Sequence, residues 1–210
     1  MPIPPIEALR EYFPALVEMV AKTSWLPNAT TVSRVGTAVF PACRYKTSRP
    51  RFSHIEENDV VLGMYDDNAT PEWAIFWAHG LQGTRPQGWT IAHVWPASDD
   101  INAYTHLANL AMVPEPFASL TDKNGPLTVF LCWHSWEVYG WKPERETEPT
   151  KPDGYDEVKW RYLEGVENPK ALICQRFNEL NNRRTRILRP IMESRKMLWA
   201  GNGKMFPEHP

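Results

Sequence analysis

The clearest helical patterns lie at the two ends of the chain. Apolar residues recur at spacings of three and four near the start, which places them on one helix face. These residues are Ile6, Leu9, Phe13, Leu16 and Val20. A helix is therefore predicted over 1–23, with a kink or break at Pro14, because proline removes a backbone donor from a helix interior. A second helical pattern covers 169–199, where Pro190 predicts a kink or two helices.

Short apolar runs in the middle of the chain favour strands, because they are rich in β-branched and aromatic residues and are bounded by turn-forming residues. The candidate strands are 31–40, 60–65, 72–80, 88–96 and the aromatic run 127–141. The stretch 101–112 predicts a helix instead, since Ser98, Asp99 or Asp100 could cap its N-terminus.

These elements predict a single α+β domain over 1–210. Residues 58–141 would form a β-rich core, and 142–168, which are rich in proline and charge, would form a surface loop. The helical stretches 1–23 and 169–199 would flank that core. The 20 prolines favour many loops and short elements over a helical bundle.

Cysteine usage and hydropathy favour a cytoplasmic protein without membrane contact. The three cysteines are far apart and form no CxxC pair, which fits free thiols in a reducing compartment. No apolar run approaches the roughly 20 residues that cross a bilayer, and the N-terminus lacks the pattern of a signal peptide.

Basic residues gather in two stretches although the net charge is −2. Residues 22–51 contain six basic residues and no acid, and residues 183–196 contain six basic residues and one acid. The acids concentrate in 142–168. This segregation could create a basic face that attracts phosphates, or the charges could simply solvate the surface. The residues expected to contact nucleic acid are Arg49, Arg51, Lys123, Arg183 and Arg186.

Ten tryptophans indicate extensive aromatic packing. Core packing is the favoured role of those in the middle of the chain, and a platform for stacking bases is the alternative. The tryptophans concerned are Trp73, Trp77, Trp89, Trp95, Trp133, Trp136 and Trp141. His134 lies within the apolar run FLCWHSW, which favours a buried histidine.

The most specific pattern lies in residues 88–123. The fragment AHVWPAS places His93 at the end of a predicted strand, just before Pro96, and the fragment LANL supplies Asn109 and Leu110. The fragment ASLTDK then leads through a turn and a helix. In this layout the stretch, about a sixth of the chain, resembles the ββα-metal (HNH) endonuclease superfamily.

The resemblance implies a ββα fold and the hydrolysis of nucleic-acid phosphodiester bonds, with DNA favoured as the substrate. His93 would be the general base, since an imidazole with a pKa of about 6.5 can deprotonate water at neutral pH. Asn109 would hold the histidine loop in place. Mg²⁺ or another divalent cation, bound at Asp122, would stabilise the charge on the phosphate. A homodimer is a possible assembly.

Two positions depart from the superfamily pattern. Ala92 and Ala118 stand where many members have metal ligands, and alanine cannot coordinate a cation. Each motif residue also has a simpler interpretation. His93 could be a buried histidine bonded to backbone, Asn109 a capping residue and Asp122 a turn residue.

Three functions follow from these observations. The first is a metal-dependent endonuclease, and the second is a catalytically inactive HNH-like module that binds nucleic acid. The third is an unrelated α+β protein that acts through protein contacts. A ββα arrangement in which Asn109 bonds near the hairpin would favour the first two.

Overall fold

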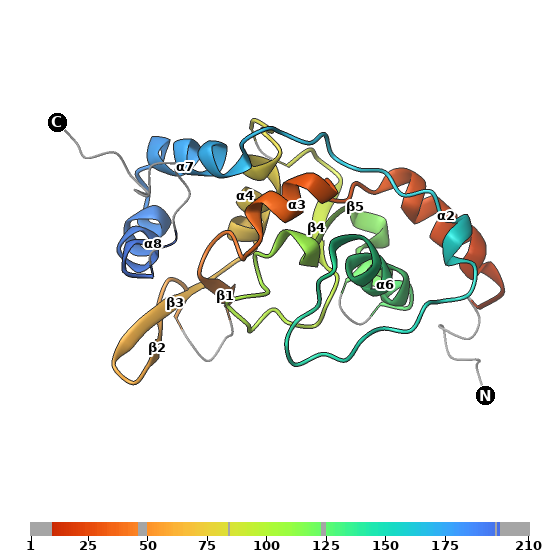
Figure 1. Ribbon diagram of the computed structural model, residues 1–210, viewed down its shortest axis with the longest axis horizontal. Coiled ribbons are helices and arrows are strands. Elements are labelled where there is room, and N and C mark those ends of the chain that lie inside the picture. Colours follow the sequence, from red (N-terminus) through yellow and green to blue (C-terminus); the bar gives the residue numbers. More distant parts are fainter. Residues whose placement is uncertain (1–9, 46–49, 84, 123–124, 196, 198–210) are drawn as a thin grey trace.

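The computed structural model describes residues 10–45, 50–83, 85–122, 125–195 and 197. It confirms the α+β class, with two small sheets among the helices (Figure 1). The molecule is elongated, and α7 (Pro169–Glu179) and α8 (Arg183–Ser194) lie at the opposite end from α2 (Phe13–Thr23). Within the described ranges, none of the helices combines the length and the apolar character that crossing a membrane requires.

The two sheets hold five strands. In the first, β3 (Val60–Asp66) lies between a parallel β1 (Ala42–Arg44) and an antiparallel β2 (His54–Glu57). The second is the antiparallel pair of β4 (Trp89–His93) and β5 (Leu110–Pro114). The strands predicted over 60–65 and 88–96 are therefore confirmed.

Three predicted strands are wrong, because the chain is helical there. They are replaced by α3 (Ala29–Val35), α4 (Ala69–Ala78) and α6 (Thr128–Tyr139). Seven of the ten α4 residues are buried, so this helix lacks the polar face that would reveal its period. With α4 and α6 as helices, the prediction of a β-rich core over 58–141 is also wrong.

The helix predicted over 101–112 is wrong as well. Turns lead into the 3-10 helix η2 (Leu107–Asn109), and β5 follows. Thr105 Oγ1 accepts a hydrogen bond from the Phe40 N–H (2.9 Å) and donates one to the Phe40 carbonyl (2.8 Å). Side chains that bond to backbone in this way compete with helix formation.

The two proline predictions have different outcomes. A 3-10 turn, η1 (Arg10–Tyr12), precedes α2, and Pro14 lies in the first turn of α2, where its missing donor is tolerated. Two C-terminal helices are found as predicted, but they separate at 180–182, where Asn182 caps α8, and Pro190 lies inside α8. Residues 1–9 and 198–199 lie outside the described residues.

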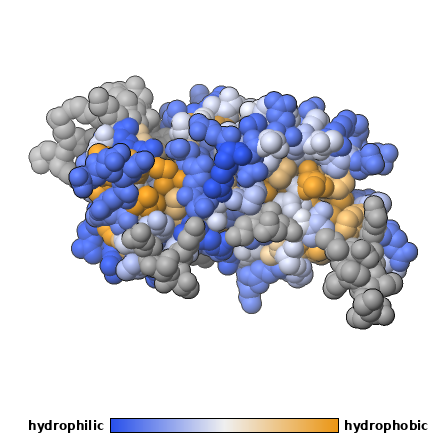
Figure 2. All heavy atoms as spheres, turned by 90° about the horizontal axis from the view of Figure 1, so that it is seen from below, coloured by the Kyte–Doolittle hydropathy of each residue, from blue (hydrophilic) through white to orange (hydrophobic). Residues whose placement is uncertain are grey.

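The remaining short helices are η3 (Glu115–Phe117), α5 (Ala118–Thr121) and η4 (Tyr155–Glu157). The loop 142–168 contains only η4 and runs along the surface toward α2 before it returns to α7 (Figure 1). The largest apolar cluster joins residues of β3, α4, β4, β5, α7 and α8. Seen from below, the surface is mostly hydrophilic, and hydrophobic side chains gather in two separate areas (Figure 2).

Candidate functional site

The predicted motif occupies a hairpin and a short helix. The loop 94–109 joins β4 to β5, and the chain then enters η3 and α5, which packs back against β4. A ββα motif of the HNH type in this stretch, and membership of the HNH superfamily, stay predictions.

Asn109 holds the hairpin loop together from inside. Its side chain is buried, and its Oδ1 accepts a hydrogen bond from the backbone N–H of Trp95 (2.7 Å). Its Nδ2 donates to the carbonyl oxygen of Ala103 (2.9 Å), and its own carbonyl accepts from the Val94 N–H (3.0 Å). One asparagine therefore satisfies backbone groups at two separate places in the loop, which fixes the shape of the loop.

His93 ends β4 with its imidazole turned into the protein. The residue is 1% exposed, and its ring stacks on the ring of Tyr104 with the centroids 4.9 Å apart. Its Nε2 lies 3.2 Å from the Tyr104 carbonyl oxygen. A carbonyl only accepts, so this contact assigns the proton to Nε2. Nε2 is therefore not the nitrogen that could take a proton from water, and this contact is that of a histidine bonded to backbone.

Asp122 ties the end of α5 to the end of β4, because its Oδ1 accepts a hydrogen bond from the backbone N–H of His93 (2.9 Å). The residues at the expected metal position do not form a ligand set for Mg²⁺. Ala92 is buried in apolar surroundings and Ala118 begins α5, and neither carries a donor atom. Across the part of the chain that the structure describes, no group of three or more His, Cys, Asp or Glu side chains could hold a metal ion.

Tyr104 links the hairpin to a second group of polar residues. While its ring covers His93, its hydroxyl donates to the carbonyl oxygen of Asp67 (2.7 Å). Burial raises the pKa of Tyr104, so the hydroxyl keeps its proton and remains a donor. The side chains of Asp66 and Asp67 hold the guanidinium group of Arg184.

Three guanidinium groups surround the ring of Phe52, and we call this group the arginine cluster. It consists of Arg51, Phe52, Arg183 and Arg184. The Cζ atoms of the three arginines lie 4.8, 5.2 and 5.1 Å from the ring centroid, respectively, within cation–π distance. Phe52 has a φ of 67°, which a residue with a side chain rarely adopts, so strained backbone carries this ring.

The arginines of the cluster differ in how far their charge is neutralised. Arg184 is mostly buried and binds both carboxylate oxygens of Asp66 at 2.8 Å. Burial raises the pKa of Asp66, and the Arg184 guanidinium opposes that rise. Arg51 pairs with Asp67 (3.1 Å) but stays 53% exposed. Arg183 is exposed and has no carboxylate within ion-pair distance among the described residues, so three cations face two acids.

The structure thus brings together two of the residues predicted to contact nucleic acid, Arg51 and Arg183. Arg186 lies exposed on α8, and Arg49 and Lys123 lie outside the described residues. Phe52, Tyr104 and Arg184 were not predicted to take part. The available signal for Phe52 is an aromatic residue directly after Arg51, at the end of the basic stretch 22–51.

His134 is buried, as predicted from its apolar surroundings. Its Nδ1 lies 2.8 Å from the Tyr155 hydroxyl, and burial lowers its pKa to about 4. The ring therefore stays neutral at physiological pH, and the contact fastens the loop 142–168 to α6. Its role is structural.

Comparisons of the chain with models of protein families, with curated proteins and with solved structures found no match.

Proposed function

We propose that this protein binds nucleic acid, with DNA favoured, through the arginine cluster. In this proposal the strand–strand–helix element is a scaffold of the HNH type rather than a centre of strand cleavage. The observation that carries the proposal is the meeting of Arg51 and Arg183, from distant parts of the chain, over the ring of Phe52.

The chemistry of the cluster suits a phosphate backbone. A guanidinium presents a planar fork of donors that matches two oxygens of a phosphate. The exposed ion pair between Arg51 and Asp67 is weak, so a phosphate can replace the carboxylate at small cost. The exposed guanidinium of Arg183 is available at the same ring.

The contacts of the motif residues fit a structural role. The Nε2 proton of His93 faces a carbonyl, Asn109 is occupied by backbone groups on both sides, and Asp122 accepts from the His93 amide. Tyr104 then connects this framework to Asp67, which pairs with two arginines of the cluster. The motif thereby positions the cluster.

Fluorescence anisotropy with a labelled DNA duplex, from about 50 to about 200 mM salt, tests the proposal. The slope of log K against log salt is negative, and its magnitude counts the phosphate contacts. We expect this magnitude to decrease by about 1 for Arg183→Ala and by about 2 for the double variant with Arg51→Ala. Lys159→Ala is the matched control, because it removes one exposed charge from the loop 142–168 near the opposite end of the molecule (Figure 1). Unaltered slopes in the double variant, or no binding by the wild type at about 50 mM salt, would refute the proposal.

The second candidate is metal-dependent cleavage with His93 as general base. It is favoured by the position of His93 at the end of β4, in a hairpin that a helix follows. Incubation of supercoiled plasmid with the protein and Mg²⁺ or Mn²⁺ separates the two candidates. We expect no nicking. Nicking by the wild type that His93→Ala abolishes would establish the nuclease instead.

A further inference from the structure

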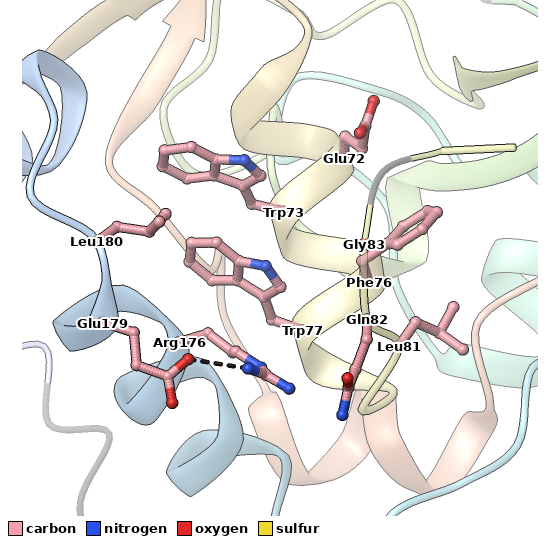
Figure 3. Close-up of a pocket in the computed structure, with 10 residues that line it drawn as sticks. All are labelled: Glu72, Trp73, Phe76, Trp77, Leu81, Gln82, Gly83, Arg176, Glu179 and Leu180. Carbon is pink, nitrogen blue, oxygen red and sulfur yellow. Dashed lines mark hydrogen bonds and ion pairs between the residues drawn. The ribbon is translucent and has the colours of Figure 1, made fainter.

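A pocket of about 300 Å³ opens between α4 and α7 (Figure 3). Its wall combines aromatic side chains of α4 with polar side chains of α7 and of the chain that follows α4. This volume is at the small end of the range for ligand pockets, which suits a single ring system.

Two tryptophans of α4 form the aromatic wall. Trp73 and Trp77 are one helical turn apart and stack with their centroids 4.8 Å apart and their planes within 16°. Figure 3 shows both indole nitrogens on the same side of the stack. Among the described residues, the fully buried indole N–H groups without a partner are those of Trp95, Trp133 and Trp160, so the N–H groups of Trp73 and Trp77 stay accessible, although Trp77 is only 8% exposed. Accessible indole N–H groups at the wall of a pocket can donate to an acceptor that a ligand supplies.

The rest of the wall offers both donors and acceptors. Arg176 and Glu179 of α7 form a partly exposed ion pair (2.8 Å) on one side. Glu72 and the exposed Gln82 lie on the side of α4. Glu179 already accepts from two side chains of α7, and Glu72 from the Arg85 backbone N–H, but each carboxylate oxygen can accept a further hydrogen bond. The wall therefore offers N–H donors and carboxylate acceptors, and the edge of a nucleobase carries groups that complement both.

The pocket adjoins the arginine cluster. The Cζ atom of Arg184 lies 5.1 Å from the ring centroid of Phe52 and 4.9 Å from that of Trp73. The same guanidinium therefore joins the cluster to the tryptophan pair. Since Trp73 lines the pocket, a nucleotide whose phosphate lies at the cluster can direct its base into the pocket.

We propose that this pocket holds one unpaired base of the bound nucleic acid while the neighbouring phosphate lies at the arginine cluster. This inference rests on the proposed function and adds a preference for unpaired bases, since a base inside a duplex is stacked and cannot enter a pocket. The protein then distinguishes single-stranded or bulged DNA from an intact duplex.

Three labelled DNAs of related sequence test the inference: a single strand, its duplex, and the same duplex with one bulged nucleotide. We expect the bulged duplex to bind about tenfold more tightly than the intact duplex, the effect of one or two additional hydrogen bonds. Trp77→Phe keeps an aromatic ring and removes the N–H, so it should reduce that preference about fivefold and leave the intact duplex unaffected. Trp89→Phe, outside the pocket, is the matched control and should change neither affinity.

A spectroscopic measurement covers the case in which Trp77→Phe fails to fold. Each of the ten tryptophans contributes one indole N–H signal to a ¹⁵N–¹H spectrum. The signal that is absent from the spectrum of Trp73→Phe or Trp77→Phe belongs to the replaced tryptophan. One folded variant is therefore enough to assign one signal of the pair. In the wild type we expect these signals to shift downfield on addition of the bulged duplex and to stay in place with the intact duplex.

The outcomes separate the two proposals. Equal, Arg183-dependent affinity for intact and bulged duplexes would overturn the pocket inference and leave the proposed function standing. No DNA binding at low salt would overturn the proposed function itself. Deoxynucleoside monophosphates should compete with the bulged duplex only weakly. If they bind the pocket while the bulged duplex shows no preference, the site serves free nucleotides and the inference is wrong.

Discussion

Replacing Asn109 by alanine removes the side chain that holds the hairpin loop. The variant leaves the backbone N–H of Trp95 without an acceptor in the interior, and the carbonyl of Ala103 keeps only the hydrogen bond from the His106 N–H. An unsatisfied buried group costs about 1–3 kcal/mol, and the lost side-chain volume adds to this, so we expect a total loss of about 3–5 kcal/mol. Because a domain is stable by only about 5–15 kcal/mol, the effect should be large.

Urea denaturation followed by tryptophan fluorescence measures this loss as a shift of the midpoint at constant slope. Asn102→Ala is the matched control in the same loop. Asn102 is exposed, and only its backbone N–H bonds to Asp100. Alanine at position 102 keeps this N–H and therefore the hydrogen bond. A loss below about 1 kcal/mol for Asn109→Ala, or equal losses in both variants, would refute the view that Asn109 fixes the loop.

Three further predictions concern stability. Burial lowers the pKa of three histidines to about 4. The unfolded chain binds protons below about pH 6.5 that the folded chain does not, so stability should fall by on the order of 2 kcal/mol per histidine between about pH 7 and pH 5 in urea titrations. These histidines are His79, His106 and His134. Tyr104→Phe should cost about 1–2 kcal/mol in the same assay, because the carbonyl of Asp67 loses its donor. Gly63→Ala should cost about 1–3 kcal/mol, since a Cβ there would lie 2.7 Å from the carbonyl oxygen of Pro41, and an unchanged midpoint would contradict this clash.

The sequence predicts best those elements whose pattern has a clear period or a clear boundary. The face formed by Phe13, Leu16 and Val20 belongs to α2, and β4 begins one residue after the predicted start at Gly88. The pattern fails for α4 and α6, where aromatic and β-branched residues favour a strand but the segment is helical. Most of α4 is buried, and α6 exposes apolar residues such as Val129 and Val138, so neither helix shows the polar face that would distinguish it from a strand.

The site was predictable in its charges but not in its geometry. The two basic stretches identify Arg51 and Arg183, yet nothing local indicates that both lie over Phe52. Their meeting depends on the packing of α8 along β3, which a pattern within either stretch cannot reveal. His93 ends β4 and Asn109 directly precedes β5, but burial and hydrogen bonding decide what such residues do, and both depend on the folded loop.

The pocket could not be predicted from the sequence, because the segment 72–80, which forms part of α4, was predicted as a strand. In a strand, Trp73 and Trp77 would share a face but lie about 13 Å apart, too far for their rings to stack. In α4 the same spacing of four places them one turn apart, and the rings stack at 4.8 Å. Arg184 of α8 then contacts the ring of Trp73 as well as that of Phe52. The proximity of the arginine cluster to the pocket therefore follows from the positions of α4 and α8, and a strand at 72–80 would have removed it.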